Sequence, residues 1–321
     1  MTPSKPVLRS HPVAAGAMIL ALLGCGDDLA SCLDVGYLDF TGSAPYFVAE
    51  GLDLFGHFST CVEGTSFATS NQLIDALAAG RIDYVAAASA APALALHAQA
   101  PDRFFLTSAS EVSPDLPFDA ILVRDTSSIT DLEDLVGTRI AVFPGTTNTA
   151  LLRHFLAERG VEAASITFVQ TPPASQLASL RSGVVDAAHV SEPTWTIGLQ
   201  DPTLRQLFGT VYGAQLAPNP QGVSLLSRAA LRRDPTGARN LVAAFDSALA
   251  FMRGNPDSTR AMLRSHFTLP GDAVGQMHLS YMRPHDAIDW DAVRAYVGLL
   301  QEVGELSTTP DIAALRLPDA Q

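Results

Sequence analysis

The sequence predicts an α/β protein built from two doubly wound lobes, and three observations support that fold class. Apolar segments of strand length alternate with amphipathic segments of helix length, which is typical of parallel sheets covered by helices. The chain has 321 residues, enough for about two domains. One short pattern, a helix end followed by Gly and then Asp at the start of a strand, occurs at residues 77–83 and again at 180–186. We therefore expect two similar units, with a cleft beyond the carboxyl ends of their strands, where open α/β sheets bind ligands.

The first unit begins with a predicted strand and then alternates regularly. Pro45 stands in the first turn of the first helix, where a missing N–H is tolerated, and Gly80 ends the second helix. The predicted strands cover residues 33–38, 57–63, 83–88, 104–109 and 120–124, and the predicted helices cover residues 45–54, 70–79 and 91–100.

The second unit repeats this alternation and leads into a helical C-terminal part. Gly160 and Gly183 end two of its helices. Its predicted strands cover residues 139–143, 166–170 and 187–190, and its predicted helices cover 130–135, 147–159 and 175–182. After a stretch with Pro218 and Pro220, a strand is predicted at 223–227 and mostly amphipathic helix over 235–301.

The N-terminus has the pattern of an export signal. Lys5 and Arg9 precede an apolar run at residues 13–24, which is too short to span a bilayer but typical of a signal peptide. The run ends at Leu-Leu-Gly-Cys, which resembles a bacterial lipobox, whose Cys is diacylated and becomes the new N-terminus. We expect a lipoprotein signal peptide at 1–24, lipidation of Cys25 and a lipid-anchored linker at 25–32. The alternative is a buried helix followed by a chance Cys.

Charge and motif content exclude several classes of protein. The chain carries 20 basic and 33 acidic residues, so it lacks the basic face that a nucleic-acid partner requires. No run of ~18 apolar residues is present, which excludes a multi-span membrane protein. His and Cys pairs at metal-ligand spacing, a Gly-x-Ser-x-Gly elbow and a Walker loop are also missing from the sequence. We expect no metal, no cofactor and no catalytic residues.

The three cysteines fit an exported protein. If Cys25 carries lipid, Cys32 and Cys61 remain as a pair in an oxidising compartment. Cys32 precedes the first predicted strand and Cys61 lies in the second, and neighbouring parallel strands can bring two cysteines within disulfide reach. We expect a Cys32–Cys61 disulfide, and the alternative is two separate buried thiols.

Several segments, in order, resemble the solute-binding proteins of ABC importers, in the branch that takes nitrate, taurine, alkanesulfonates and thiamine-precursor pyrimidines. The family often has Trp where this chain has Ser191, so aromatic stacking at that position is not implied. The segments that carry the resemblance are Val-Gly-Tyr at 35–37, Ala-Pro-Tyr-Phe-Val-Ala at 44–49, the helix–strand signature at 77–83, the second-lobe entry at 131–142, and residues 183–188 followed by Glu192-Pro193.

The resemblance implies a type II periplasmic-binding-protein clamshell that encloses a small-molecule ligand by hinge closure. Lobe 1 would comprise residues 33–123 plus 223–321, including the C-terminal helices, and lobe 2 would comprise residues 124–222. The implied partners are an ABC permease with its cytoplasmic ATPase, and the membrane through the N-terminal lipid. We expect a monomer, anchored to a bacterial membrane in the periplasm or at the cell surface.

The loops after the predicted strands supply the candidate ligand contacts. Thr146, Thr147 and Asn148 start a helix, whose free N–H groups and partial positive charge attract anions. We expect Thr146 or Thr147 to cap this helix and the segment to contact the ligand as well; the alternative is a cap alone. Ser89 follows another strand and could cap a helix, donate to the ligand, or do both.

Two further loops offer small or amide side chains. Ser43 and Ala44 would let the backbone approach a ligand closely, unless they form a plain turn. Asn71 could reach the cleft or cap the helix that follows it.

Three residues lie at or near the end of the predicted strand at 187–190, and two of them have two readings each. Glu192 could bind an amine, an amidine or a pyrimidine amino group, or it could pair with an Arg. Trp195 could stack on a planar ligand, although packing in the core is the favoured reading. His189 lies in an apolar strand and is interpreted as a core histidine.

The favoured function is therefore a lipid-anchored solute receptor. Because only Arg124 and Arg139 lie near the loops, the expected cargo is a small monoanion, a zwitterion or a neutral planar heterocycle. A carrier of apolar molecules or lipids on the same fold remains open. A pyrimidine synthase is disfavoured because those relatives carry a Cys-rich motif, and a sensor ectodomain would need a membrane span or an output domain.

Overall fold

The structure is a computed structural model that describes residues 32–267 and 269–319. The predicted signal peptide at 1–24 and the predicted lipid on Cys25 lie outside the described residues. Among the described helices, none is both long and apolar enough to cross a membrane.

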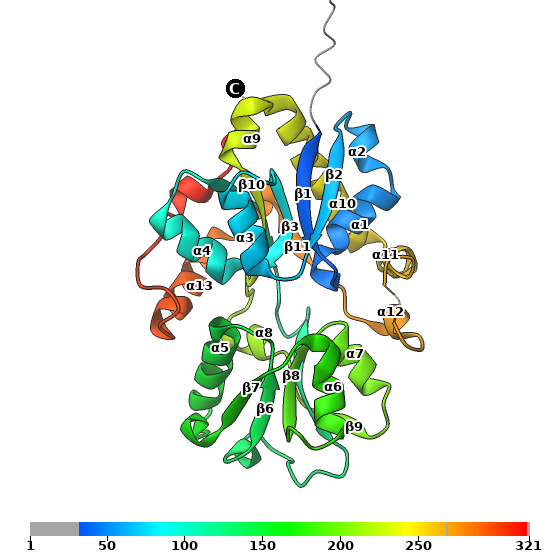
Figure 1. The fold of residues 1–321 in the computed structure, drawn as a ribbon, viewed down its shortest axis with the longest axis vertical. Helices are drawn as coiled ribbons and strands as arrows, with labels where there is room; N and C mark the ends of the chain where they lie inside the picture. The colour runs from blue at the N-terminus through cyan, green and yellow to red at the C-terminus, as the bar shows by residue number, and fades with distance from the viewer. Residues whose placement is uncertain (1–31, 268, 320–321) are drawn as a thin grey trace, which may run out of the picture. The chain divides into compact units, whose positions relative to one another are not determined.

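A mixed six-stranded sheet forms the centre of the first lobe (Figure 1). Its strand order is β11-β4-β10-β3-β1-β2. β1 runs parallel to β2 and β3, whereas β10 runs antiparallel to both β3 and β4. The strands are β1 (Leu33–Leu38), β2 (Val62–Phe67), β3 (Tyr84–Ser89), β4 (Phe104–Ser110), β10 (Gly222–Ser227) and β11 (Met282–Pro284).

A five-stranded sheet forms the centre of the second lobe, in the order β7-β6-β8-β5-β9. β6, β7 and β8 are parallel, and β5 runs antiparallel to β8 and β9. The strands are β5 (Asp119–Arg124), β6 (Arg139–Val142), β7 (Thr167–Gln170), β8 (Ala187–Ser191) and β9 (Leu204–Gly209). The two-unit α/β fold class is confirmed.

The predicted boundary between the lobes near residue 124 is wrong. β5 pairs with β8 and β9, so the strand predicted at 120–124 belongs to the second lobe. Its apolar side chains, among them Ile121 and Val123, are buried in the core of that lobe. The chain therefore crosses between the sheets at residues 111–118 and returns at 210–221. The sequence shows that a strand exists here but not which sheet it joins.

Helices cover both faces of the first sheet. The side chains of β3 divide between the two faces: Tyr84 and Ala86 pack with α1 and α10, whereas Val85 and Ala88 pack with α3, α4 and α13. The helices of this lobe are α1 (Ala44–Gly51), α2 (Leu54–His57), α3 (Ser70–Ala78), α4 (Ala90–Gln99), α9 (Arg228–Arg233), α10 (Pro235–Gly254), α11 (Pro256–Leu263), α12 (Ala273–Gln276) and α13 (Trp290–Glu302).

The second sheet is covered in the same way. α5 and α8 pack on one of its faces, and α6 and α7 pack on the other. These helices are α5 (Thr146–Ala157), α6 (Pro173–Arg181), α7 (Thr194–Leu199) and α8 (Val211–Gln215).

A bend of the backbone at Asp53 makes two predicted element boundaries in the first lobe wrong. The helix predicted over 45–54 is split into α1 and α2, because Asp53 adopts a left-handed conformation with a φ of 51°. α2 then extends to His57, so the strand predicted over 57–63 begins only at Val62. In the second lobe, the helix predicted over 130–135 is a single 3₁₀ turn at Glu133–Leu135.

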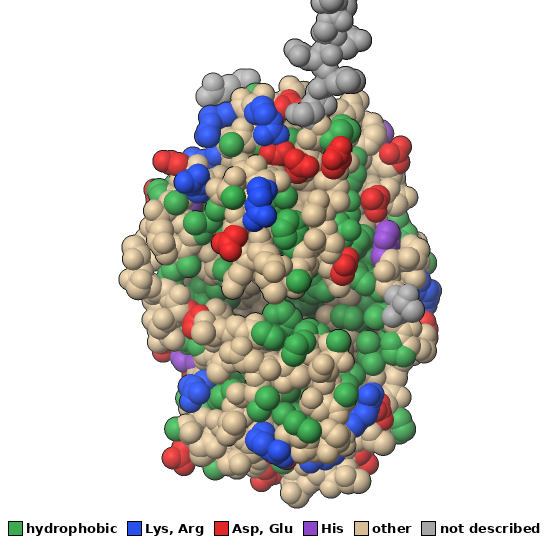
Figure 2. Space-filling view, viewed as in Figure 1, with side chains coloured by type: hydrophobic (Ala, Val, Ile, Leu, Met, Phe, Trp, Pro, Cys, Tyr) green, Lys and Arg blue, Asp and Glu red, His purple; other side chains and the backbone are tan. Residues whose placement is uncertain are grey.

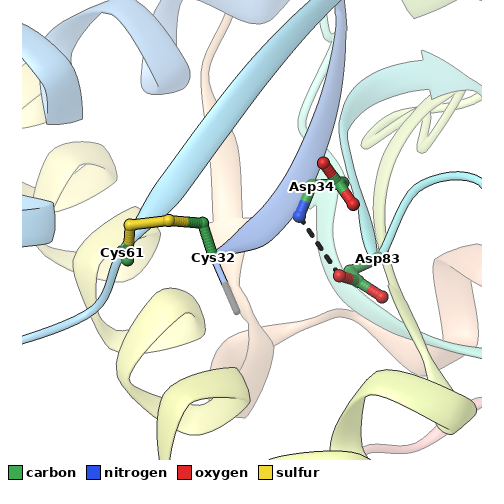
Figure 3. The surroundings of a disulfide bond; sticks show 4 residues. All are labelled: Cys32, Asp34, Cys61 and Asp83. Atoms are coloured by element: carbon green, nitrogen blue, oxygen red, sulfur yellow. Dashed lines mark hydrogen bonds between the residues drawn. A yellow bond between two sulfur atoms is a disulfide. The ribbon is translucent and has the colours of Figure 1, made fainter. Parts of the chain in front are cut away.

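The repeated Gly and Asp pattern performs the same task in both lobes. The Asp83 carboxylate accepts a hydrogen bond from the backbone N–H of Asp34 in β1, at 3.1 Å (Figure 3). The Asp186 carboxylate accepts one from the backbone N–H of Arg139 in β6, at 2.9 Å. Each Asp thus fixes the start of the neighbouring parallel strand, which confirms the predicted internal repeat.

The predicted disulfide between Cys32 and Cys61 is confirmed (Figure 3). The two cysteines immediately precede β1 and β2, and the backbone N–H of Leu33 donates to the carbonyl of Cys61 at 2.9 Å. The bond closes a loop with a sequence separation of 29 residues, which contains α1 and α2.

Candidate ligand-binding site

The strand ends of the two sheets bring small and polar residues together between the lobes. β1 and β3 end at the loops that open α1 and α4, and β6 and β8 end at the loops that open α5 and α7. Thr41 Oγ1, after β1, donates to the carbonyl of Glu192, after β8, at 3.2 Å. The strand ends point toward each other in Figure 1, and Figure 2 shows a hollow between the lobes on this face. The loops predicted from the sequence therefore meet across the two lobes.

The first turn of α5 is open at this position. Gly145 is the N-cap residue, with a φ of 128°, and it has no side chain to cover the helix start. Within the described residues, no hydrogen bond reaches the backbone N–H groups of Thr146, Thr147 or Asn148. The prediction that a threonine caps this helix is wrong, because neither hydroxyl bonds to the helix start. The positive end of α5 therefore presents unpaired donors.

Both threonine hydroxyls bond instead to a carboxylate from the first lobe. Thr146 Oγ1 and Thr147 Oγ1 donate to Glu305 Oε2, at 2.9 and 2.6 Å. Glu305 follows the end of α13. No sequence pattern singles out Glu305, because 158 residues separate it from Thr147.

A groove with a mixed, mostly apolar lining lies along α5 beside this contact. Its volume is about 480 Å³, and the only first-lobe residue in its lining is Val303. The remaining lining residues come from α5 and the end of β7: Thr146, Thr149, Ala150, Arg153, His154, Ala157 and Gln170. We call the contact of Glu305 with Thr146 and Thr147 the rim at α5, one of the edges at which the two lobes touch.

Asn148 is engaged within the second lobe. Its Oδ1 accepts a hydrogen bond from the hydroxyl of Tyr212 in α8, at 2.7 Å. Burial, followed by the nearby Asp119 carboxylate, raises the pKa of Tyr212 well above its usual value, so the phenol remains a donor. The Asn148 side chain thus ties α5 to α8 through Oδ1, and neither its Nδ2 nor its backbone N–H has a hydrogen bond to a described residue.

Glu192 is almost completely buried, with 2% of its surface exposed. Its Oε1 lies 2.8 Å from Thr196 Oγ1 and 2.7 Å from Nδ1 of His278, and accepts from the backbone N–H of His278 at 3.1 Å. Its Oε2 accepts from the backbone N–H of Thr196 at 3.2 Å. The alternative of an Arg partner is therefore wrong, because the side chain that Glu192 meets across the lobes is His278 of the first lobe.

Trp195 also faces His278. The two rings stack, with centroids 4.4 Å apart and planes 14° from parallel. The indole N–H donates to Gln206 Oε1 at 3.0 Å, and the residue is 5% exposed. This agrees with the favoured reading of Trp195 as a core residue. Trp195 and Glu192 together form a second rim of contact between the lobes.

The first-lobe candidates differ in how accessible they are. Ser43 and Ala44 are fully buried, and the Ser43 hydroxyl accepts from the backbone N–H of Leu38 at 3.2 Å. Asn71 is exposed and does not cap α3, because Thr69 is the N-cap. Ser89 is partly exposed at the end of β3, and its hydroxyl has no hydrogen bond to another described residue.

His189 is a core residue, as predicted. It is 4% exposed, and its Nε2 lies 2.7 Å from the buried Asp119 carboxylate.

The two arginines expected near the loops lie elsewhere. Arg139 is the first residue of β6, so it lies at the opposite end of the strand from α5. It pairs with Asp186 at 3.1 Å, and its side-chain hydrogen bonds lower the pKa of that carboxyl. Arg124 donates to the carbonyls of Leu180 and Val185. Within the described residues, no Arg side chain hydrogen-bonds to the first turn of α5, and the chain's one lysine precedes them.

Two mixed α/β lobes, joined by two crossing segments and facing each other at their strand ends, define a two-lobed solute-binding fold. Solved structures share it. The periplasmic aliphatic sulphonate-binding protein of Escherichia coli superposes with a TM-score of 0.72 at 21% identity, covering 90% of this chain and 94% of that one. The periplasmic nitrate-binding protein of Synechocystis PCC 6803 superposes with a TM-score of 0.66 at 17% identity, covering 88% and 84%.

Sequence comparison identifies the family. Residues 30–265 match the model of the NMT1-like family, and the chain belongs to that family. An aliphatic sulfonates-binding protein of Escherichia coli K12 is 26% identical over 75% of this chain and 72% of its own length. A taurine-binding periplasmic protein of the same strain is 31% identical over 48% of this chain and 46% of its own length. These relatives are binding proteins, and the predicted resemblance is confirmed.

Proposed function

We propose that this protein captures a small organic monoanion, of the sulfonate type, between its lobes and delivers it to an ABC permease with a cytoplasmic ATPase. The observation that carries the proposal is the open first turn of α5, which faces the first lobe with unpaired N–H groups. The names of the relatives, which bind aliphatic sulfonates and taurine, agree with this chemistry.

The chemistry of the α5 turn suits a singly charged group. A helix N-terminus carries roughly half an elementary charge together with several aligned donors, and it needs no lysine or arginine to bind an anion. Sulfonates have three acceptor oxygens and one charge, which matches the N–H groups of residues 146–148. Across the interlobe region, the Ser89 hydroxyl is a further available donor.

The organic part of the cargo would meet apolar surface. Phe143, directly after β6, is 42% exposed, which is unusual for a phenylalanine beside a helix start. Closure of the lobes would stabilise the bound state through contacts made only when both strand-end loops touch the cargo. In this proposal the structural side chains, which stabilise the lobes and the contact between them, are those of Asn148, Glu192 and Trp195. The protein binds its cargo without changing it chemically.

We also propose that the chain is a lipoprotein, cleaved before Cys25 and held to a bacterial membrane as a monomer. The leader pattern at 1–24 supports this, and the Cys32–Cys61 disulfide fits an oxidising compartment. Replacement of Cys25 by Ala should release an unacylated form from the membrane. A Cys25→Ala protein that fractionates and migrates like the wild type would rule out the anchor.

The cargo class is tested by thermal melts of the full-length chain against methanesulfonate, taurine, nitrate and an aminopyrimidine. A ligand present at 100 times its Kd stabilises a protein by about 2.7 kcal/mol, a shift of several degrees in melting temperature. We expect a shift with methanesulfonate and none with the aminopyrimidine. The reverse pattern would exclude the anion proposal, and a shift with none of the four would favour an apolar cargo.

A matched pair of variants then locates the site. Thr146→Pro removes one backbone N–H at the first helical position, where proline is tolerated, and Thr146→Val removes only the hydroxyl. Loss of one hydrogen bond to a charged group costs about 1.5 kcal/mol, or roughly tenfold in Kd. We expect that loss for Thr146→Pro only. Equal binding by both variants would show that the anion binds elsewhere.

A further inference from the structure

Glu305 is held firmly by the first lobe while it touches the second. α13 ends in a Schellman motif: the N–H of Glu305 donates to the carbonyl of Leu300 at 2.8 Å, and the N–H of Gly304 donates to that of Gln301 at 3.1 Å. Gly304 has the positive φ, 77°, that this motif requires. Leu306, the next residue, is buried in the lobe 1 core. The backbone that carries the Glu305 side chain is therefore fixed in lobe 1.

The carboxylate of Glu305 occupies the side of the α5 turn. One oxygen, Oε2, accepts from both threonine hydroxyls, at 2.9 and 2.6 Å, and hydrogen bonds of this kind to a charged acceptor are the stronger ones. The other oxygen, Oε1, has no hydrogen bond to a described residue. A negative charge is thus placed beside the positive end of α5, where the helix field favours it.

No cation among the described residues neutralises this charge. Arg153 and His154 line the neighbouring groove, but Arg153 lies over the ring of Phe168, 5.0 Å from its centroid, and His154 is 3.5 Å from Glu158. An anion bound to the N–H groups of residues 146–148 must therefore displace the carboxylate or stay beside a like charge.

We propose that Glu305 is a specificity-determining residue, an internal carboxylate that opposes each negative charge on the cargo. The inference rests on the proposed function of the α5 turn. It makes the site selective for monoanions over dianions, because like-charge repulsion grows with the charge of the ligand. Glu305 thus selects ligands by the number of their negative charges, whereas the α5 turn selects negative over positive ligands.

The test compares methanesulfonate, a monoanion, with sulfate, a dianion, by isothermal titration of the full-length chain. Glu305→Gln keeps a hydrogen-bond acceptor but removes the charge. We expect methanesulfonate to bind about tenfold tighter and sulfate about a hundredfold tighter to this variant, as expected for one and two charges against a partly exposed carboxylate. The matched control is Glu302→Gln, an exposed residue of α13 three positions away, which should change neither affinity.

Two failures can be told apart. If methanesulfonate binds the wild type and Glu305→Gln changes neither affinity nor the sulfate-to-methanesulfonate ratio, the role of Glu305 is wrong and the anion site stands. If neither anion binds the wild type or Glu305→Gln, the proposed function and the inference both fail. An equal gain with Glu302→Gln would show a general charge effect and would also overturn the inference.

Discussion

The two lobes touch at two rims, and each rim is built on a carboxylate that crosses between them. At one rim Glu192 of lobe 2 meets His278 of lobe 1, and at the other Glu305 of lobe 1 meets Thr146 and Thr147 of lobe 2. Glu192 is 2% exposed and both of its oxygens have partners, whereas Glu305 is partly exposed and uses one oxygen.

This difference in burial and hydrogen bonding makes the Glu192 contact structural and the Glu305 contact exchangeable. A carboxylate can be buried only if donors replace the water it loses, and Glu192 has such donors from Thr196 and His278. Water can replace the two hydroxyls as donors to Glu305, and another anion can replace the carboxylate as their acceptor, at little cost. The rim at α5 is therefore the one at which a cargo can compete.

The largest effect is expected from truncating the buried carboxylate. Glu192→Ala leaves the Thr196 hydroxyl and backbone donors without an acceptor, and should lower the free energy of unfolding by about 3 kcal/mol. Glu305→Ala should lower it by less than about 1 kcal/mol, as for an exposed polar pair. Urea unfolding of both variants measures the contrast. Equal losses of unfolding free energy in the two variants would show that the two carboxylates do not differ in structural importance.

A smaller effect is expected from Trp195→Phe at the buried rim. The phenyl ring can still stack on His278, but the hydrogen bond to Gln206 is lost and a small void forms. The free energy of unfolding should fall by about 1 to 2 kcal/mol. Methanesulfonate affinity should stay within about twofold, because the open α5 turn is at the other rim. A tenfold loss of affinity in calorimetry would instead place Trp195 at the cargo.

The smallest expected effect is on the pH dependence of the melting temperature. It tests the Asp246–His285 pair, which lies outside both rims. The Asp246 carboxylate, 2.6 Å from Nδ1 of His285, raises the pKa of that imidazole above 6.5. A raised pKa means stability that is full below pH 6.5 and is lost as pH rises through the folded-state value. Melting temperatures from pH 5.5 to 8.5 should therefore fall less in His285→Gln than in the wild type. An identical slope in both proteins would assign the pH dependence to other groups.

The parts of the structure that depend on local order could be predicted from the sequence. The Gly and Asp repeat, the disulfide and the position of the start of α5 each depend on residues close to a strand or helix end. The partner of Glu192 lies 86 residues away and that of Thr147 lies 158 residues away, so only the folded chain shows them. The sheet to which β5 belongs was hidden for the same reason, because an apolar strand suits either core.

Local propensity also failed where tertiary contacts replaced it. Threonines at a helix start normally cap it, but the hydroxyls of Thr146 and Thr147 bond to Glu305. Asn71 was a reasonable cap for α3, but Thr69 takes that position two residues earlier. At α5 this failure coincides with the candidate site, which is where local rules are expected to give way.

The most direct test of the anion site is a titration of the amide-labelled full-length chain with methanesulfonate, followed by NMR. We expect downfield proton shifts that saturate together for the amides of Thr146, Thr147 and Asn148, because these N–H groups gain a charged acceptor. The amides in the first turn of α6, which begins with Pro173, should not move. Saturable shifts confined to other segments, with the α5 amides unchanged, would show that the anion does not bind at the first turn of α5.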